Sequence, residues 1–398
     1  MRKTVLILVI ALTFCSCGTQ RMADKHVAVQ PPPTSPPPTQ VSKSLLIRKQ
    51  RLIKPLYGDL LKDVAVSKNS FNPTLSERVS ISYSLSRPAK VAVNVYDPDH
   101  GLVVSKKCEE FLPVEKHVFI WDGRDMNGNI VPDEAYFFTI VAQDKSGLKE
   151  IYDPTTFSGG TEHDITDAYI DPEFHTITYT MPEMGRVMIR LGIQGGPLMN
   201  QLVDWKPRTK GVVNEYWDGK DRDKIVDIYN NPKFKMIISY FSLPENSIIT
   251  FGNKNYDFRI YKKTIAMNRP TKPKRASSVQ KVSHHYRLPR TVDYCPEIHM
   301  SFSNLKGYDK NGIPILYGKT MVKIDLAKED KPIFQNQKFE ICFFLDGEFY
   351  AEDEAGYTPF NWVWDLSNVP AGKHIFTVNL SGFKDQIGVS SKRIRVVK

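Results

Sequence analysis

The sequence lacks the features that mark most enzymes and most membrane-spanning proteins. Apart from the N-terminal residues 5–14, no apolar run approaches the roughly twenty residues that a membrane-spanning helix needs. A Gly-x-Ser-x-Gly elbow, a phosphate-cradling glycine loop and a recurring pair of carboxylates are all missing. None of the five cysteines lies beside a histidine at the spacing of a metal site. We therefore predict no catalytic residue, no cofactor and no metal, and an enzyme site assembled between domains stays open.

The first 17 residues have the pattern of a signal peptide. Arg2 and Lys3 precede the apolar residues 5–14, which are too few to span a bilayer permanently. A small residue followed directly by Cys17 resembles the lipobox of bacterial lipoproteins, and this resemblance implies that Cys17 becomes the lipidated N-terminus. We expect a cell-envelope lipoprotein of the outer membrane, and the face of the membrane stays open. An ordinary secreted protein is the alternative.

Residues 18–59 are predicted to form a proline-rich tether. Residues 31–38 read Pro-Pro-Pro-Thr-Ser-Pro-Pro-Pro, and such a run stays extended in polyproline II at about 3.1 Å per residue. Residues 18–43 could then hold the next domain up to roughly 80 Å from the membrane. A ligand for a proline-binding groove is the alternative interpretation.

The chain contains an internal repeat. Residues 121–125, Trp-Asp-Gly-Arg-Asp, recur 96 positions later at 217–221 as Trp-Asp-Gly-Lys-Asp. The same offset aligns residues 81–85 with 177–181 without a gap. A period near one hundred residues is typical of a duplicated small domain and too long for a solenoid unit. We predict that the two tryptophans occupy equivalent buried positions.

From residue 60 onward the pattern favours short antiparallel strands. Val79, Ile81 and Tyr83 alternate with serines, as in a half-buried strand, and helical periodicity is nearly absent. Short strands separated by regular turns are typical of a β-sandwich. We predict an all-β chain with three tandem sandwiches and a linker before the third. The predicted ranges are 60–150, 151–257, the linker 258–292, and 293–398.

The first predicted sandwich contains Val-Ala-Val-Ser at 64–67, Phe-Asn-Pro at 71–73, residues 81–85, residues 91–96, residues 121–125, Gly128 and Tyr136. Together these residues resemble the Ig-like domain of the bacterial flagellar hook-capping protein. The resemblance covers residues 60–150 and is weaker in the second copy. It implies an Ig-like fold, and a module that recurs in many secreted and surface proteins. The third sandwich contains Phe-Phe-Leu-Asp-Gly at 343–347, Pro-Phe-Asn-Trp at 359–362 and Pro-Ala-Gly-Lys-His at 370–374. These residues resemble Ig-like accessory modules of secreted bacterial enzymes.

Much of the net charge of +10 lies in the predicted linker. Residues 258–292 carry ten lysines and arginines and no acidic residue. We identify Lys272, Lys274 and Arg275 as candidate contacts for an anionic polymer or lipid headgroups, because uncompensated basic residues attract anionic surfaces. Merely solvated side chains are the alternative, and no nucleic-acid partner is predicted.

Two polar clusters resemble metal sites in composition only. Asp122, Asp125, Asn127 and Asn129 place oxygen donors around one turn, as in calcium loops, but the same residues cap tight turns without a metal. The adjacent histidines at 284–285 would point to opposite faces of a strand, so we expect them to be solvated linker residues.

Two alternatives concern the third sandwich. Trp362 and Trp364 alternate with Val363 and would face one side together, which favours a core position, while Trp362 is also the candidate for carbohydrate contacts. Cys295 and Cys342 could form a disulfide in an oxidising compartment, or both could remain thiols.

The leading functional hypothesis is a non-catalytic, lipid-anchored envelope protein. Its sandwiches would serve as a structural spacer or as interaction surfaces in a cell-envelope assembly, with the membrane and other envelope proteins as partners. The alternative is a carbohydrate-binding surface lipoprotein that acts through the C-terminal module. Fold likeness alone establishes neither hypothesis.

Overall fold

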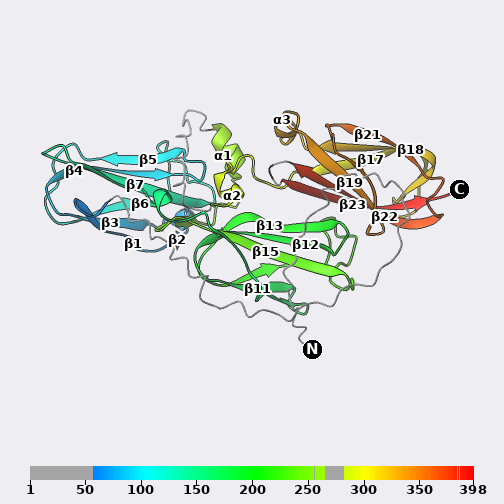
Figure 1. Cartoon of the computed structure of the whole chain (residues 1–398), viewed down its shortest axis with the longest axis horizontal. Coiled ribbons are helices and arrows are strands. Elements are labelled where there is room, and N and C mark those ends of the chain that lie inside the picture. Colours follow the sequence, from blue (N-terminus) through cyan, green and yellow to red (C-terminus); the bar gives the residue numbers. More distant parts are fainter. Residues whose placement is uncertain (1–56, 255, 265–281, 383, 385) are drawn as a thin grey trace, which may run out of the picture. The chain divides into compact units, whose positions relative to one another are not determined.

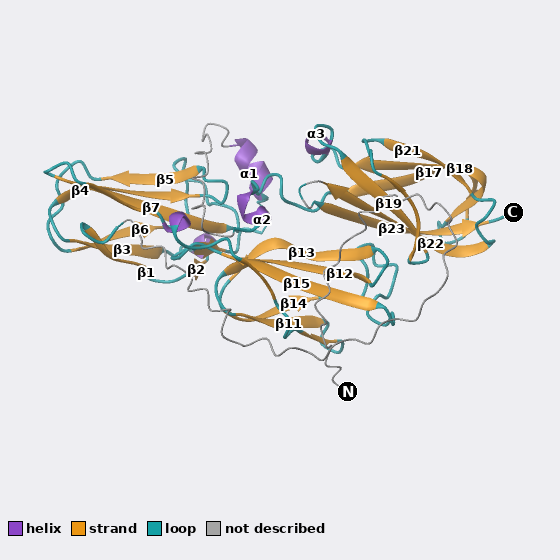
Figure 2. Cartoon of the chain, viewed as in Figure 1, coloured by secondary structure: helices purple, strands orange, loops and turns teal. Residues whose placement is uncertain are grey.

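About half of the described residues lie in β-strands, and few lie in helices. The computed structural model describes residues 57–254, 256–264, 282–382, 384 and 386–398. Within these residues the strands form five sheets, and the helical elements are short (Figure 2). The predicted all-β fold is confirmed.

The first sandwich consists of a small sheet and a large sheet (Figure 1). The small sheet has the order β1 (Leu61–Val66), β3 (Val79–Leu85), β6 (Lys116–Trp121). The large sheet has the order β2 (Ser70–Phe71), β16 (Ile248–Thr250), β7 (Ala135–Asp144), β4 (Ala89–Tyr96), β5 (Leu102–Lys107), and β8 (Lys149–Tyr152) pairs with β7. The 3-10 turns η1 (Pro73–Leu75) and η2 (Pro154–Thr156) follow β2 and β8.

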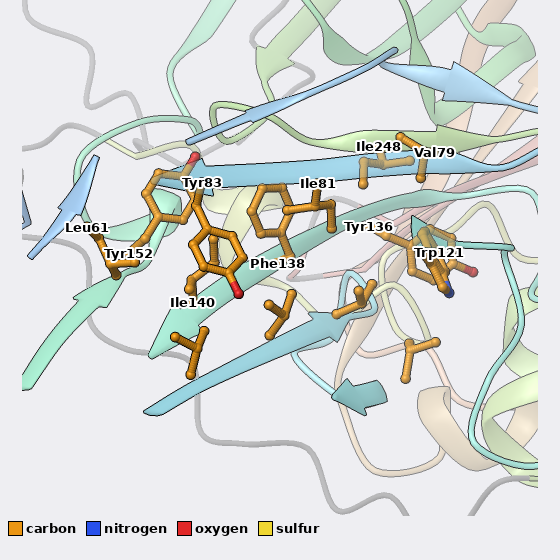
Figure 3. Packing of buried hydrophobic residues seen from close by; sticks show 14 of the residues in the cluster. Leu61, Val79, Ile81, Tyr83, Trp121, Tyr136, Phe138, Ile140, Tyr152 and Ile248 are labelled. Atoms are coloured by element: carbon orange, nitrogen blue, oxygen red, sulfur yellow. The ribbon is translucent and has the colours of Figure 1, made fainter. Parts of the chain in front are cut away.

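The alternation of apolar and polar residues determines which face of each strand is buried. In β3, Ile81 and Tyr83 are buried, whereas the serines between the apolar residues are half-exposed. Figure 3 shows these side chains in one cluster with Phe138 of β7 and Trp121 of β6. The core of the first sandwich therefore lies between its two sheets.

The second sandwich repeats this plan with its own core. Its small sheet has the order β10 (Tyr169–Asp171), β11 (Thr176–Met181), β14 (Gly211–Tyr216). Its larger sheet has the order β13 (Leu198–Arg208), β12 (Gly185–Ile193), β15 (Phe234–Ser242), β9 (Glu162–Asp164).

The repeat predicted from the sequence is confirmed in the strand register. Ile81 faces Phe119 in the first small sheet, and Ile177 faces Glu215 in the second, so both partners move by the same 96 positions. Both repeat tryptophans are 2% exposed. Each donates its indole N–H to the carbonyl three residues further along, at 3.0 Å in the first copy and 2.8 Å in the second. The duplicated motif therefore builds the same buried turn twice.

The third sandwich closes a single seven-stranded sheet around one core. Its strands are β17 (Ile298–Tyr308), β18 (Pro314–Leu326), β19 (Phe339–Leu345), β20 (Glu348–Asp353), β21 (Phe360–Asp365), β22 (Gly372–Gly382) and β23 (Ile387–Val396). The long β18 pairs along its length with β17, near its start with β23, and further on with β21. The short helix α3 (Lys331–Phe334) adds Phe334 to the core.

After the second sandwich the chain returns to the first. β16 follows β15 and pairs antiparallel with β7 and parallel with β2. The helix α1 (Phe258–Thr264) then adds Phe258 and Tyr261 to the first core, and Figure 3 shows Ile248 of β16 among the residues of that core. Strand β16 lies within the range predicted for the second sandwich and α1 begins the predicted linker, yet both contribute to the first sandwich.

Candidate functional site

A buried ion cluster joins the first sandwich to the second. Glu134, directly before β7, lies 2.6 Å from Arg186 of β12, and their side chains are 2% and 3% exposed. The guanidinium of Arg290 lies 3.4 Å from the same carboxylate. Burial alone raises the pKa of Glu134, but the two arginine charges outweigh it and lower the pKa to about 2. The carboxylate is therefore ionised and compensated at neutral pH.

Arg290 is held from several elements. Its guanidinium donates to the backbone carbonyls of Asp293 at 2.8 Å and Asp204 at 3.2 Å. Its backbone N–H donates to the carboxylate of Asp99, in the turn between β4 and β5, at 2.5 Å. The arginine therefore connects that turn to β13 of the second sandwich.

The histidine pair differs from its prediction. His284 and His285 lie in the short helix α2 (His284–Arg287), and His285 is buried, with its ring centroid 4.2 Å from that of Trp205. Its Nδ1 lies 3.0 Å from a carboxylate oxygen of Asp293. The prediction of a solvated histidine is wrong for His285, because the segment that follows the basic stretch packs onto β13 instead of running through solvent.

The β4–β5 turn holds both ends of the basic stretch. Lys262 of α1 reaches the fully buried carboxylate of Asp97 at 2.6 Å, and Arg290 reaches Asp99. The candidate anion contacts Lys272, Lys274 and Arg275 lie between these two points but outside the described residues.

A cleft of about 590 Å³ opens at the same junction. Arg290, Lys206 of β13, Lys254 and Tyr294 are among its lining residues, together with Asp133 and Asp204. Desolvation lowers the pKa of Lys206 and raises the pKa of Asp204 and Asp133, so the surrounding protein penalises all three charges. Its volume lies within the range of small-molecule sites, about 300–1,000 Å³.

The turn around Asp125 uses its oxygens within the protein. One carboxylate oxygen accepts the backbone N–H groups of Asn127 and Asn129, both at 2.9 Å. The carboxylate of Asp122 accepts the N–H of Arg124 at 3.1 Å. These bonds support the turn-capping interpretation of the cluster over a calcium loop.

Trp362 faces the interior of the third sandwich. Its ring stacks on Phe343 with centroids 4.6 Å apart and on Trp364 at 5.6 Å, and it is only partly buried. The core position predicted for the Trp362–Trp364 pair is confirmed for Trp364, which is 1% exposed. Only the unburied part of Trp362 is left for contact with a sugar.

The other predicted residues are placed as follows. Cys17 lies outside the described residues. No helix in the described part of the chain is long and apolar enough to cross a membrane. Cys295 is a thiol and does not bridge to Cys342; burial raises its pKa to about 12, which makes it a poor nucleophile.

Sequence reasoning missed the ion cluster. One signal was present: the first copy has Asp133-Glu134-Ala135 where the resembled module has a glycine before Tyr136, and a charge there needs a partner. Arg186 was a second signal, because it is a cation directly before the apolar residues Val187 to Ile189. Neither signal identifies its partner, since the contact joins residues 52 positions apart.

Comparisons with known proteins agree with a β-sandwich and go no further. No family model and no curated protein matches the chain. FlgD from P. aeruginosa is 25% identical, and the match covers 24% of this chain and 72% of the FlgD chain, with a TM-score of 0.19. The fibronectin(III)-like modules of Clostridium thermocellum CbhA are 12% identical, covering 84% and 94%, with a TM-score of 0.18. A bacterial ice-binding adhesin is 10% identical, covering 86% and 98%, with a TM-score of 0.17. At these TM-scores the likenesses carry no argument about function, and the fold assignment rests on the strands described above.

Proposed function

We propose that this chain is a non-catalytic, lipid-anchored envelope protein whose first two sandwiches form one stiff arm. The observation that carries the proposal is the return of β16 into the first sheet after the second sandwich is complete. Two chain crossings instead of one therefore join the sandwiches. A module held in this way can act as a spacer or as a fixed interaction surface.

The buried ions strengthen the junction. Domain interfaces within a chain usually permit relative motion. Here, separating the sandwiches would break the contact between Glu134 and Arg186, and removing one partner of a buried pair costs about 3–5 kcal/mol. The junction is therefore expected to stay closed under thermal motion.

The anchor is proposed from the sequence alone. Cys17 would carry the lipid, and the proline-rich residues 18–59 would hold the arm away from the outer membrane. Partners would be other envelope proteins, with an anionic polymer at Lys272, Lys274 and Arg275 as a further proposal. A spacer needs no catalytic group, and the sequence contains none of the catalytic motifs considered above.

Hydrogen exchange tests the stiff arm. The N–H groups of Ile249 and Thr250 donate to Asn69 and Glu134 at 2.8 and 2.9 Å, so they should exchange as slowly as the central amides of β7. As a reference within the same sample, the N–H groups of Asn127 and Asn129, which donate to a side chain in an exposed turn, should exchange faster. Rapid exchange throughout β16 would contradict the proposal.

Fractionation tests the anchor separately. Cys17→Ser should block lipidation, so that the protein with its signal removed appears in the soluble fraction. The matched control is Cys108→Ser, which changes a cysteine beyond the predicted signal and should leave the protein in the membrane fraction. If mature Cys17→Ser protein still pellets with membranes after a high-salt wash, the anchor lies elsewhere.

A further inference from the structure

The charges that line the junction cleft are unequally satisfied. Asp133 accepts the backbone N–H groups of Gly252 and Asn253 at 3.1 and 2.7 Å. Asp204 accepts the N–H of Cys295 and the side-chain amide of Gln201, both at 2.7 Å. The acceptors in the cleft therefore already have protein donors.

Two cations of the cleft have no such partner. The side chains of Lys206 and Lys254 make no hydrogen bond and no ion pair with the described residues, and both residues are exposed where they line the cleft. The other cations are paired: Arg208 with Glu215 at 2.7 Å and Arg259 with Asp330 at 3.1 Å. The unsatisfied charge in the cleft is therefore positive.

Tyr294 forms part of the cleft wall. The residue is 7% exposed, and its hydroxyl oxygen is buried. Burial raises its pKa and the nearby carboxylate of Asp330 raises it further, so the hydroxyl keeps its proton at neutral pH. The guanidinium of Arg259 lies 4.2 Å from the ring centroid and helps to fix the ring in place.

We propose that this cleft binds a small molecule or chain end that carries an oxyanion, either a carboxylate or a phosphate, with Lys206 as the main contact and Lys254 as the second. Desolvation by the surrounding protein lowers the pKa of Lys206, and no described residue forms an ion pair with its side chain. A lysine in this situation is typical of a binding site. The aromatic walls of Tyr256 and Phe251 suit a ring or an apolar body next to the anionic group. This inference does not depend on the lipid anchor.

Calorimetry with defined probes tests the site. The purified full chain is titrated with inorganic phosphate and, separately, with glucuronate, at constant ionic strength in a chloride buffer. Saturable binding of either probe is expected; the probe that binds more tightly distinguishes a phosphate source from a carboxylate source. Lys206→Met should weaken binding by roughly tenfold or more, as expected when a charge-assisted hydrogen bond is lost.

The matched control is Lys116→Met, an exposed lysine on β6 that does not line the cleft and should leave the affinity unchanged. Lys206→Met should unfold at the same temperature as the parent protein or higher, since the substitution removes a disfavoured charge, so lost binding is separable from lost folding. The absence of saturable binding for both probes would overturn the proposal. A second result would also overturn the proposal: Lys206→Met binds the probe with normal affinity, but neutralising Lys272, Lys274 and Arg275 abolishes binding. That result would place the anion on the basic segment.

Discussion

The first and second sandwiches share one sequence pattern but retain different parts of its structure. Their small sheets keep the same register at the 96-residue offset. Their large sheets do not: Val91 faces Ala142 in the first copy, whereas Val187 faces Tyr240 in the second, two residues beyond the offset. Side chains alternate with a period of two, so this shift keeps the same residues on the core side. The second copy therefore changed its hairpin by an even number of residues without exposing its core.

The two copies differ also in how complete they are. The first core includes Ile248, Phe258 and Tyr261, which follow the second sandwich in the chain, whereas the second core consists of residues 165–240. The first sandwich therefore cannot be completed until the second has been synthesised. Mutations in the two copies should not have symmetrical effects.

The largest expected effects are at the repeat tryptophans. Trp121→Ala and Trp217→Ala should each cost about 3–5 kcal/mol of unfolding free energy, because each removes a large, fully buried side chain. Hydrogen exchange should show that Trp121→Ala also loosens β16 and α1, whereas Trp217→Ala leaves them protected. Equal loss of protection in β16 in both variants would mean that the two sandwiches unfold as one unit.

A slightly smaller effect is expected where the copies are joined. Glu134→Gln should cost about 3 kcal/mol, because it leaves Arg186 and Arg290 without their buried counter-charge. At the 96-residue offset the second copy has Asn230, an exposed turn residue, and Asn230→Ala should cost less than about 1 kcal/mol. Urea unfolding measures both changes. Similar costs for the two substitutions would contradict the assigned role of Glu134.

The sequence predicted those parts of the fold that depend on local patterns. Alternation predicted the strands, because it is visible within a few neighbouring residues. The ungapped 96-residue offset predicted the buried tryptophans, because both copies carry the same short motif. The return of β16 was not predictable, since Ile248 to Thr250 is three residues long and its partners lie more than a hundred positions earlier. The candidate site depends on contacts of the same kind, such as Arg290 with Asp99, 191 positions apart.

The β4–β5 turn should make the junction sensitive to pH. Burial raises the pKa of Asp99 to about 6, above the ordinary 3.8. A carboxyl with a raised pKa stabilises the fold while it is protonated, so its contribution is lost as the pH rises through about 6. From pH 5 to pH 7.5 this group should lower the unfolding free energy by about 1 kcal/mol.

The second copy supplies the comparison, since the position equivalent to Asp99 is Gly195 and cannot titrate. Asp99→Asn should therefore reduce the loss of stability between pH 5 and pH 7.5, which urea unfolding at the two pH values would measure. Glu134 should not interfere, because its lowered pKa affects stability only in acid, as the pH falls from about 4.5 towards 2. An unchanged pH dependence in Asp99→Asn would show that other groups cause it.

The smallest expected effects lie in the repeated turn, where the first copy has Gly128 and the second has Lys224. Both residues have a positive φ, 82° and 61°, and a side chain at such a φ costs about 1 kcal/mol. A Cβ at Gly128 would meet nothing within 4 Å, so Gly128→Ala should cost only this backbone term. Lys224→Gly should change the free energy of unfolding by less than about 0.5 kcal/mol. The substitution relieves the backbone strain, but glycine makes the unfolded chain more flexible. It also removes the exposed ion pair with Asp218, whose atoms are 2.9 Å apart. Thermal unfolding of both variants measures these changes in stability. A clear gain in stability from Lys224→Gly would mean that the ion pair contributes nothing and that the second copy retains unrelieved backbone strain.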